Sequence, residues 1–274
     1  MSIPPLKIGI PVINRGDLLE ACVASMDAPV ERVVIIANRW GAHYEASVEA
    51  ALNRLAESHP PCIGSLEIIE TGGNLGVAGS YNFAMQTLGP CVIASNDTRF
   101  APGTLARCGE FMAARGDHAM HFLFSMGVFS APQIFSDEVG WFDENFWPWG
   151  WDDIDVKYRM RKRGLKTASL PREMGTIFHD HPTQSIFGSP EPLRKWMQRM
   201  SGRNMEYGMK KWGIREEHCF MLNKADRWAI DPAVLTDAGN GWTLDEETRR
   251  QRIALLKEET GIETPLIFCR STGR

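Results

Sequence analysis

The amino-acid sequence predicts an α/β fold, in which helices cover both faces of a mostly parallel sheet. Two observations support this class. Between residues 7 and 125, short apolar runs rich in β-branched residues alternate with helical stretches. The runs are almost continuously apolar, as expected for strands that are buried on both faces. The remainder of the chain is largely helical, so we expect a sheet domain over residues 1–182 and a helical C-terminal extension over residues 183–274.

The expected elements follow one another in a regular order. The strands are residues 7–13 (KIGIPVI), 32–37 (RVVIIA), 66–70 (LEIIE), 91–95 (CVIAS) and 119–125 (AMHFLFS), and the helices between them are 17–26, 43–58, 77–88 and 102–114. A charged helix is then expected over 152–163, closed by Gly164 as a C-terminal cap. A short strand at 175–178 and two amphipathic helices at 191–212 and 244–260 complete the pattern, and the last begins with a capping box at 243–246.

Composition excludes several classes of protein. The 274 residues carry 30 Lys and Arg against 34 Asp and Glu, a net charge of −4, which does not favour nonspecific binding to nucleic acid. The six cysteines form none of the close pairs typical of zinc sites, and we expect them to be reduced in a cytoplasmic protein. No apolar run approaches the ~18 residues of a membrane span, and the N-terminus lacks a signal peptide, so stable membrane insertion is not expected.

Polar residues follow the predicted strands, at the point where each strand ends. In an open parallel sheet, ligands bind beyond the carboxyl ends of the strands. The residues expected at this edge are Asn14 and Arg15 after the first strand, Asn38 to Trp40 after the second, Gly72 to Asn74 after the third, and Asn96 to Thr98 after the fourth. The pattern therefore predicts a binding site there.

The glycine-rich stretch GGNLGVAGSYN, residues 72–82, lies between a strand and a helix. Its position suits a phosphate-binding turn, because glycines let backbone N–H groups approach an anion at a helix N-terminus. Neither a dinucleotide fingerprint nor a P-loop is present. The alternative is a tight turn in which Gly76 and Gly79 allow the helix to pack closely on the sheet, although Asn74 and Asn82 favour contact with a polar ligand.

Asp97 and two histidines are the candidate metal ligands. Asp97 follows a strand, and one carboxylate suits a magnesium or manganese ion that already carries a diphosphate. The alternative is an Asx turn. His179 and His181 lie two residues apart after an apolar run, so that on a strand both imidazoles would point the same way.

The segment FWPWGWDDIDVKYR, residues 146–159, places aspartates at the start of the charged helix. Asp152 suits the N-cap position and Asp155 the third helical position, where a carboxylate favours the helix dipole. Asp153 has no such local explanation, which makes it a candidate functional carboxylate. Trp149 and Trp151 flank this site.

Taken together, the motifs resemble those of the inverting family 2 glycosyltransferases, which have the GT-A fold. The resemblance covers residues 6–182. IPVINRGDLL (10–19) resembles the opening P-x-x-N-R segment, and NLGVAGSYN (74–82) resembles the N-x-G segment under the sugar nucleotide. Asn96-Asp97-Thr98 occupies the place of the D-x-D metal motif, and EVGWFDE (138–144) followed by WDDID (151–155) resembles the acceptor-side block.

The resemblance implies the roles of individual residues. Asp153 would be the general base, Asp152 would shape the catalytic site, and Trp149 and Trp151 would contact the acceptor. Asp97 and His179, or His181 in its place, would hold Mn²⁺ or Mg²⁺ on the diphosphate of the donor. The donor-binding residues would be Pro11, Asn14, Arg15, Asn38, Asn74, Gly76, Gly79, Asn82, Asn96 and Asp97.

The chain departs from the family pattern at two positions. Ala37 replaces the acidic residue after the second strand, which leaves the base of the donor open, and Ser95 replaces the first aspartate of the metal motif. The implied activity is transfer of a hexosyl or pentosyl group from a nucleoside-diphosphate sugar to a glycan, a protein or a modified nucleobase. The alternatives are a sugar-nucleotide pyrophosphorylase and a non-catalytic carbohydrate-binding protein of the same fold.

Overall fold

The computed structural model describes residues 5–38, 46–71, 74–179 and 191–214, and four positions beyond them, Glu247, Gln251, Ala254 and Glu258. These four positions are helical, in agreement with the helix expected over 244–260. Trp40, Gly72, Gly73 and His181 lie outside the described residues, as does the predicted capping box at 243–246.

The first half of the described chain alternates strands and helices as predicted. Its elements are β1 (Leu6–Val12), α1 (Gly16–Ala24), β2 (Val30–Ala37), α2 (Ala46–Glu57), β3 (Leu66–Glu70), α3 (Gly76–Leu88), β4 (Cys91–Ala94), β5 (Thr98–Phe100) and α4 (Thr104–Ala113). The second half contains β6 (Met120–Phe124), β7 (Val128–Ala131), η2 (Phe135–Val139), η3 (Glu144–Phe146), α5 (Asp152–Lys162), β8 (Thr167–Ser169), η4 (Arg172–Met174), β9 (Ile177–His179) and α7 (Glu191–Trp212).

Seven strands form the main sheet in the order β3-β2-β1-β4-β7-β6-β8. All neighbours are parallel except for β7, which runs antiparallel to both β4 and β6. The predicted α/β class with a mostly parallel sheet is confirmed. The sequence analysis missed β5, β7 and β8, because strands of three or four residues are too short to show a periodic pattern.

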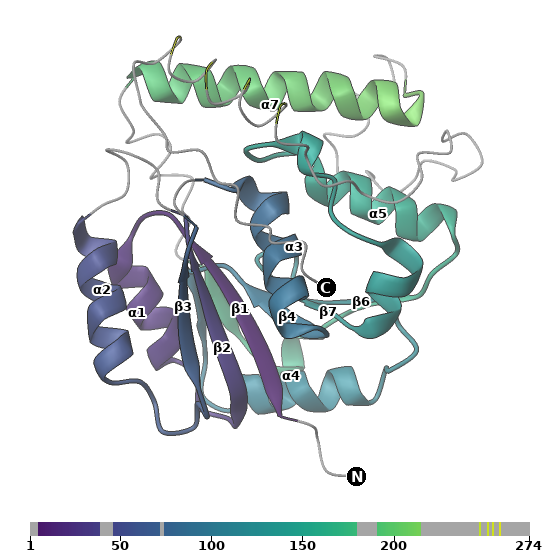
Figure 1. The fold of residues 1–274 in the computed structure, drawn as a ribbon. Helices are drawn as coiled ribbons and strands as arrows, with labels where there is room; N and C mark the ends of the chain where they lie inside the picture. Colours follow the sequence, from purple (N-terminus) through teal and green to yellow (C-terminus); the bar gives the residue numbers. More distant parts are fainter. Residues whose placement is uncertain are drawn as a thin grey trace.

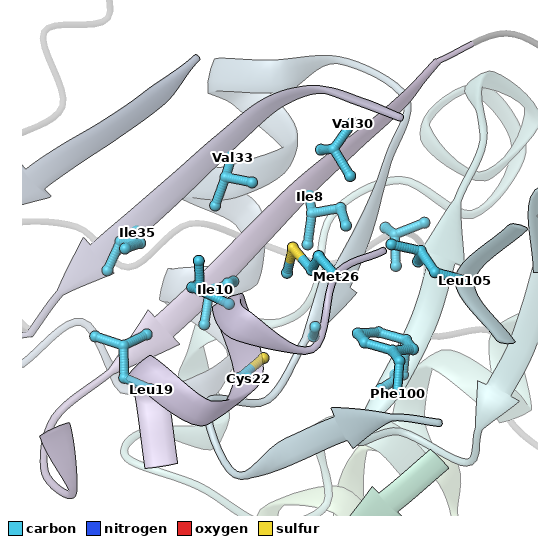
Figure 2. Packing of buried hydrophobic residues seen from close by; sticks show 14 of the residues in the cluster. Ile8, Ile10, Leu19, Cys22, Met26, Val30, Val33, Ile35, Phe100 and Leu105 are labelled. Carbon is cyan, nitrogen blue, oxygen red and sulfur yellow. The ribbon is translucent and has the colours of Figure 1, made fainter. Parts of the chain in front are cut away.

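Alternating side chains of the strands separate two cores. Ile8 and Ile10 of β1 and Val33 and Ile35 of β2 point toward α1, where they pack with side chains such as Cys22 (Figure 2). The intervening residues of β2, Val34 and Ile36, pack on the opposite face with side chains of α3 and α5. Helices therefore cover both faces of the sheet, with α1 and α2 on one side and α3 and α5 on the other (Figure 1). The near-continuous apolar runs follow from this burial.

The strand order reverses between β1 and β4. β2 and β3 follow β1 outward in one direction of the sheet, whereas β4 pairs with β1 on its other side. Such a reversal leaves a crevice beyond the carboxyl ends of the two strands, where ligands bind in open α/β sheets. Asn96 spans this point, because its Nδ2 donates to the backbone oxygen of Asn14 at 3.0 Å. Asn14 and Asn96, predicted at one edge, therefore lie together.

Helix α7, from the predicted C-terminal extension, lies across the top of the molecule above α3 and α5 (Figure 1). Asn204 on α7 donates to the backbone oxygens of Trp147 at 3.2 Å and Trp149 at 2.9 Å. The helix thus holds the tryptophan-rich loop that leads into α5. In the described part of the chain, no helix has the length and apolar character needed to cross a membrane. Cys22, Cys62, Cys91 and Cys108 are free thiols, as expected.

Candidate functional site

Asp97 and His179 meet at the carboxyl edge of the sheet. The antiparallel pair β5–β9 sets Thr98 opposite His179, which brings the imidazole beside the preceding residue. Asp97 is only 1% exposed, and its Oδ2 lies 3.0 Å from His179 Nε2 at an angle that forms no hydrogen bond. Ser95, which replaces the first aspartate of the metal motif, donates from Oγ to Asp97 Oδ1. The tertiary structure therefore joins two residues that lie far apart in sequence.

This pair fits a divalent cation in part. Asp97 Oδ2, buried and without a hydrogen bond from the residues that the structure describes, lies beside an imidazole nitrogen, and the two are donor atoms of kinds that Mn²⁺ accepts. Within the described ranges, no group of three or more His, Cys, Asp or Glu side chains could hold a metal ion. Further ligands would have to come from water or from a bound diphosphate, as is common for magnesium sites.

The aspartates of α5 do not have the capping roles that we expected. The helix begins at Asp152 after Trp151, which has a left-handed φ of 71° and provides no side-chain cap. The interpretation of Asp152 as N-cap and of Asp155 as its third-position companion is therefore wrong. Asp152 instead accepts from the backbone N–H of Gly150 at 3.0 Å, and Asp155 is fully buried. Gly164 does follow the helix with φ 63°, as predicted.

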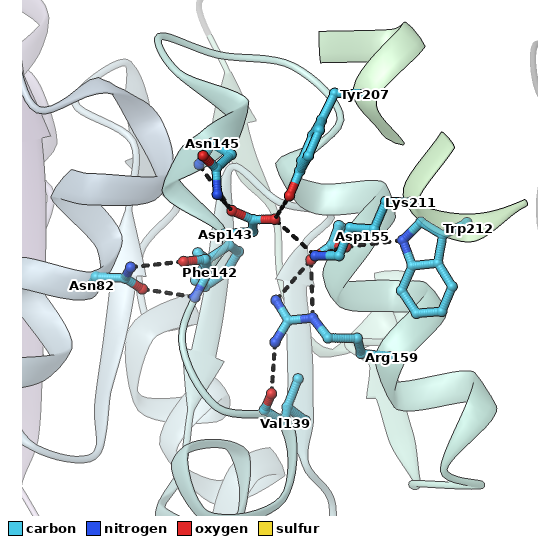
Figure 3. A network of polar contacts seen from close by, with 10 residues as sticks. All are labelled: Asn82, Val139, Phe142, Asp143, Asn145, Asp155, Arg159, Tyr207, Lys211 and Trp212. Atoms are coloured by element: carbon cyan, nitrogen blue, oxygen red, sulfur yellow. Dashed lines mark hydrogen bonds and ion pairs between the residues drawn. The ribbon is translucent and has the colours of Figure 1, made fainter. Parts of the chain in front are cut away.

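Asp155 belongs to a buried network of charges that joins α5 to α7 (Figure 3). Its Oδ2 accepts from Arg159 Nε at 2.9 Å, and its Oδ1 lies 2.7 Å from Lys211 Nζ and 2.9 Å from Trp212 Nε1. Lys211 also bonds Asp143 at 2.8 Å. Two carboxylates and two cations thus balance one another in the interior. Asp155 holds α7, and no local pattern indicated this role because Lys211 and Trp212 belong to another element.

Asp152 and Asp153 differ in environment. Asp152 is 5% exposed, and burial raises its pKa to about 7, with the negative charge of Asp153 contributing. The Asp153 side chain is 32% exposed, and Lys157 Nζ donates to its Oδ2 at 2.9 Å one helical turn away. The sequence analysis missed Lys157, although the i, i+4 spacing is a signal for such a pair.

Tyr81 links the two groups of carboxylates. Burial raises the pKa of Tyr81, and the negative charges of Asp152, Asp153 and Asp97 raise it further. The charges of all three carboxylates therefore act on this one phenol. Its ring packs edge-on against Phe129 and Phe142, with centroids 5.1 and 5.2 Å away. The sequence analysis did not predict Tyr81 as a site residue, because the neighbouring glycines and asparagines, and not Tyr81, matched the motif over residues 74–82.

The glycine-rich turn before α3 packs closely on the tryptophan loop. At Gly76, with φ 72°, an added Cβ would lie 2.6 Å from Trp147 Cδ1, and at Gly79 it would lie 3.1 Å from Leu75 Cβ. The first N–H groups are occupied within the protein: that of Gly76 by Asn74 Oδ1 at 2.8 Å, that of Leu75 by Asn38 Oδ1 at 3.0 Å, and that of Val77 by the Pro148 oxygen at 2.8 Å. Of the two alternatives, these contacts match close packing.

Asn38 and Asn82, both predicted donor contacts, are buried and bonded to protein atoms. Asn38 Nδ2 donates to Ser80 Oγ at 3.0 Å. Asn82 exchanges two 2.8 Å hydrogen bonds with the backbone of Phe142 and donates to Glu144 Oε1 at 2.9 Å. Asn82 therefore holds the segment that precedes the tryptophan loop, and Asn38 holds the start of α3.

We expect Asn82→Ala to destabilise the protein by about 2–4 kcal/mol, because it leaves the buried backbone N–H and C=O of Phe142 without their partner. Urea unfolding measures the loss, with Gln86→Ala, an exposed position on the same helix, as the matched control. If stability were unchanged while binding of a nucleoside diphosphate was lost, Asn82 would be a donor contact and this structural role would be excluded.

The remaining predicted residues lie at the same edge or under α7. Pro11 lies in β1, and Arg15, with a left-handed φ of 58°, binds Asp17 at 2.7 Å. Trp149 is half-buried, and its Nε1 is enclosed without a hydrogen-bond partner among the described residues. The Trp151 ring packs on Gly208 of α7, where an added Cβ would lie 2.4 Å from its Cε3. Trp151 therefore packs against α7, whereas Trp149 takes less part in packing.

Asp152→Asn is expected to change how stability depends on pH. A carboxyl group whose pKa is raised from 3.8 to about 7 keeps a proton in the folded state that the unfolded state releases, so stability falls as pH rises from about 4 to 7. Asparagine resembles the protonated form and avoids this loss. The variant should exceed the wild type by on the order of 3 kcal/mol at pH 8 and match it near pH 4. Urea unfolding at both pH values measures this, and an equal difference at both would contradict the assignment.

Comparison with known proteins bears on the fold. No protein-family model matches the chain, and no curated protein matches it in sequence. Among solved structures, the mannosyltransferase PcManGT from Pyrobaculum calidifontis, in complex with GDP-Man and Mn²⁺, is similar with a TM-score of 0.52 and 19% identity, over 62% of this chain and 55% of that one. S. aureus TarS 1–349 is similar with a TM-score of 0.51 and 10% identity, over 78% and 77%.

The chain has the GT-A fold. It spans about half the length of the mannosyltransferase that it resembles. At these identities the likeness extends to the fold, and membership of family 2 stays a prediction. The candidate site residues share one location on the GT-A sheet: the Asp97–His179 pair and the loops after β1 and β4 all lie at its carboxyl edge.

Proposed function

We propose that the chain is a glycosyltransferase that moves a sugar from a nucleoside-diphosphate sugar to an acceptor hydroxyl. The observation that carries the proposal is the Asp97–His179 pair at the carboxyl edge of a GT-A sheet, linked to Asp153 through one cavity that Phe124, stacked on His179, and Lys157, bonded to Asp153, both line. A transferase needs both groups in one place: one to bind the leaving diphosphate and the other to accept a proton from the acceptor.

The donor is assigned to the crevice between β1 and β4. Asn14 and Asn96 meet at its mouth, and Pro11 and Arg15 are proposed to contact the donor beside them. Asn38 and Asn74 hold the adjacent α3 turn in place, and Asn82 ties α3 to Phe142. Asp97 Oδ2 and His179 Nε2 would hold Mn²⁺ or Mg²⁺ on the donor diphosphate. When bound, such an ion offsets the charge that develops on the departing diphosphate. His181, outside the described residues, stays an alternative ligand.

The acceptor hydroxyl is assigned to Asp153. This carboxylate is the more exposed of the pair, and Lys157 fixes its position by a 2.9 Å bond. As general base, Asp153 removes the hydroxyl proton while the oxygen attacks the anomeric carbon from the face opposite the leaving group, which inverts its configuration. Asp152 lies behind it and anchors the Gly150 backbone. Trp149 and Trp151 remain the proposed acceptor-side aromatic residues. Of the two, Trp149 takes less part in packing.

Donor turnover tests this function. The full chain is incubated with manganese and a panel of nucleoside-diphosphate sugars, and release of the nucleoside diphosphate is followed by coupled assay. We expect release with one donor class, faster when acceptor glycans are added. Release of pyrophosphate from a sugar nucleotide and a nucleoside triphosphate would indicate a pyrophosphorylase instead. A chain that acts on none of the donors, yet binds sugars, would be a non-catalytic carbohydrate-binding protein.

His179→Ala is expected to raise the Mn²⁺ concentration needed for half-maximal nucleoside diphosphate release by at least about tenfold, because one of two protein ligands is lost. EDTA should abolish release by the wild type. His118→Ala is the control, since His118 pairs with Asp117 on the protein surface, away from this edge. An unchanged manganese dependence in His179→Ala would remove His179 from the proposed site.

A further inference from the structure

A cavity of about 870 Å³ opens beside the proposed catalytic centre, between α5, the end of β6 and the segment after β8. This volume lies in the range of small-molecule sites. The antiparallel pairing of β7 with both β4 and β6 makes β6 parallel to β4. The carboxyl end of β6, where Phe124 and Ser125 line the cavity, therefore lies at the same edge of the sheet as the proposed donor site.

Two contacts connect the cavity to the catalytic groups. Lys157 lines it and bonds Asp153 at 2.9 Å. Phe124 also lines it and stacks on the His179 ring, with centroids 5.6 Å apart and planes inclined by 29°. The cavity is thus separated from Asp153 by the Lys157 side chain and from His179 by the Phe124 ring, each of which lines it.

Among the described residues of its wall, the charges have one sign. Lys157, Arg161 and Arg172 line the cavity, and no aspartate or glutamate stands with them in the described part of the chain. Lys157 is already paired with Asp153, but neither Arg161 nor Arg172 has a side-chain hydrogen bond or ion pair within the described residues. Arginine is the side chain best suited to bind a carboxylate or phosphate through two parallel hydrogen bonds.

The spacing of Asp153 and Arg161 along α5 gives the distance between them. Arg161 follows Asp153 by eight residues, which at 1.5 Å per residue places it about 12 Å further along the helix. An anionic group held by Arg161 would thus be separated from the hydroxyl at Asp153. The cavity wall also includes the aromatic ring of Phe122 and the hydroxyls of Thr167 and Ser169, which suit a sugar ring and its hydroxyl groups.

We infer that this cavity is the acceptor site and that its acceptor is an acidic glycan, whose carboxylate or phosphate binds Arg161 and Arg172 while a hydroxyl group reaches Asp153. The inference rests on the proposed transferase function and adds the class of acceptor. A half-open cavity of about 870 Å³ with three cationic side chains favours a glycan over a nucleic acid, which would need an extended basic surface.

Direct titration of the full chain tests the inference without any donor. Glucose 6-phosphate, glucuronic acid and glucose are titrated calorimetrically at low ionic strength. We expect both acids to bind at least tenfold more tightly than glucose, and the double variant Arg161→Gln/Arg172→Gln to lose at least tenfold in affinity for them. A preference for one acid distinguishes phosphate from carboxylate as the natural group. Equal binding of all three sugars by the wild type would overturn the inference.

The matched control is Lys162→Gln/Lys166→Gln, which removes two cations near the end of α5 that do not line the cavity. Its affinities should stay within twofold of the wild type, and an equal loss in both double variants would overturn the site-specific assignment. If Arg161→Gln/Arg172→Gln does not fold, Arg172→Gln alone, at an exposed side chain, should lose at least threefold. Nucleoside diphosphate release by the wild type tests the proposed transferase function separately. The transferase function and the acidic-acceptor site can therefore be contradicted independently of each other.

Discussion

Asp153→Asn is expected to lower kcat for sugar transfer by about 10²–10⁴-fold, because the amide cannot accept the proton of the acceptor hydroxyl. The substitution keeps the size of the side chain, and its site is one-third exposed, so the fold should be retained. The measurement is nucleoside diphosphate release at saturating donor and manganese, with thermal unfolding on the same preparation. Donor affinity should be little changed, because Asp153 is assigned to the acceptor.

Two variants sharpen this test. Glu110→Gln, at an exposed carboxylate on α4, should keep full activity. Lys157→Met removes the cation that positions Asp153 without removing the base, so a smaller loss than that of Asp153→Asn is expected. Full activity in Asp153→Asn would contradict the proposed mechanism. Asp152, with its pKa near 7, would then be the next carboxylate to test as the general base.

Asp155→Asn, two residues along the same helix, is expected to destabilise the protein by about 3–5 kcal/mol. The substitution leaves the buried cations Arg159 and Lys211 with one carboxylate, that of Asp143, between them. Asp155 is completely buried and Arg159 is 2% exposed, so water cannot replace the lost partner. Thermal unfolding should show a fall in Tm on the order of 10 °C.

The neighbouring Asp153→Asn is the matched control for stability, since it changes the same residue type in the same turn of α5. Limited proteolysis adds a second readout, because loss of Asp155 should release α7 from α5 and expose the chain near Trp212. If Asp155→Asn were as stable as Asp153→Asn, the network in Figure 3 would not hold α7 in solution.

Much of the fold was predictable because its signals are local. Apolar runs marked β1 to β4 and β6, and Gly164 marked the end of α5. Asp97 and His179, which the sequence analysis predicted as metal ligands, lie 3.0 Å apart. Their placement depends on β5 and β9, strands of three residues each that pair across a separation of 81 positions and show no periodic pattern.

The roles of the aspartates were not predictable in the same way. Local rules explained Asp152 and Asp155 as helix-start residues, whereas in the structure one is buried beside Gly150 and the other is bound to α7. Capping rules consider the few residues around a helix end. They take no account of a lysine 56 positions later, Lys211, whose charge requires a buried carboxylate.

The sequence by itself determined the α/β class, the order of the early strands and helices, and the polar residues at the carboxyl edge, because each depends on neighbours in the chain. Only the tertiary structure decided which of those residues face one another. It placed Asp97 beside His179, bonded Asn38 and Asn82 to protein atoms, and set Lys157, Arg161 and Arg172 in one cavity. Burial and charge pairing depend on distance in space, which residue spacing does not encode.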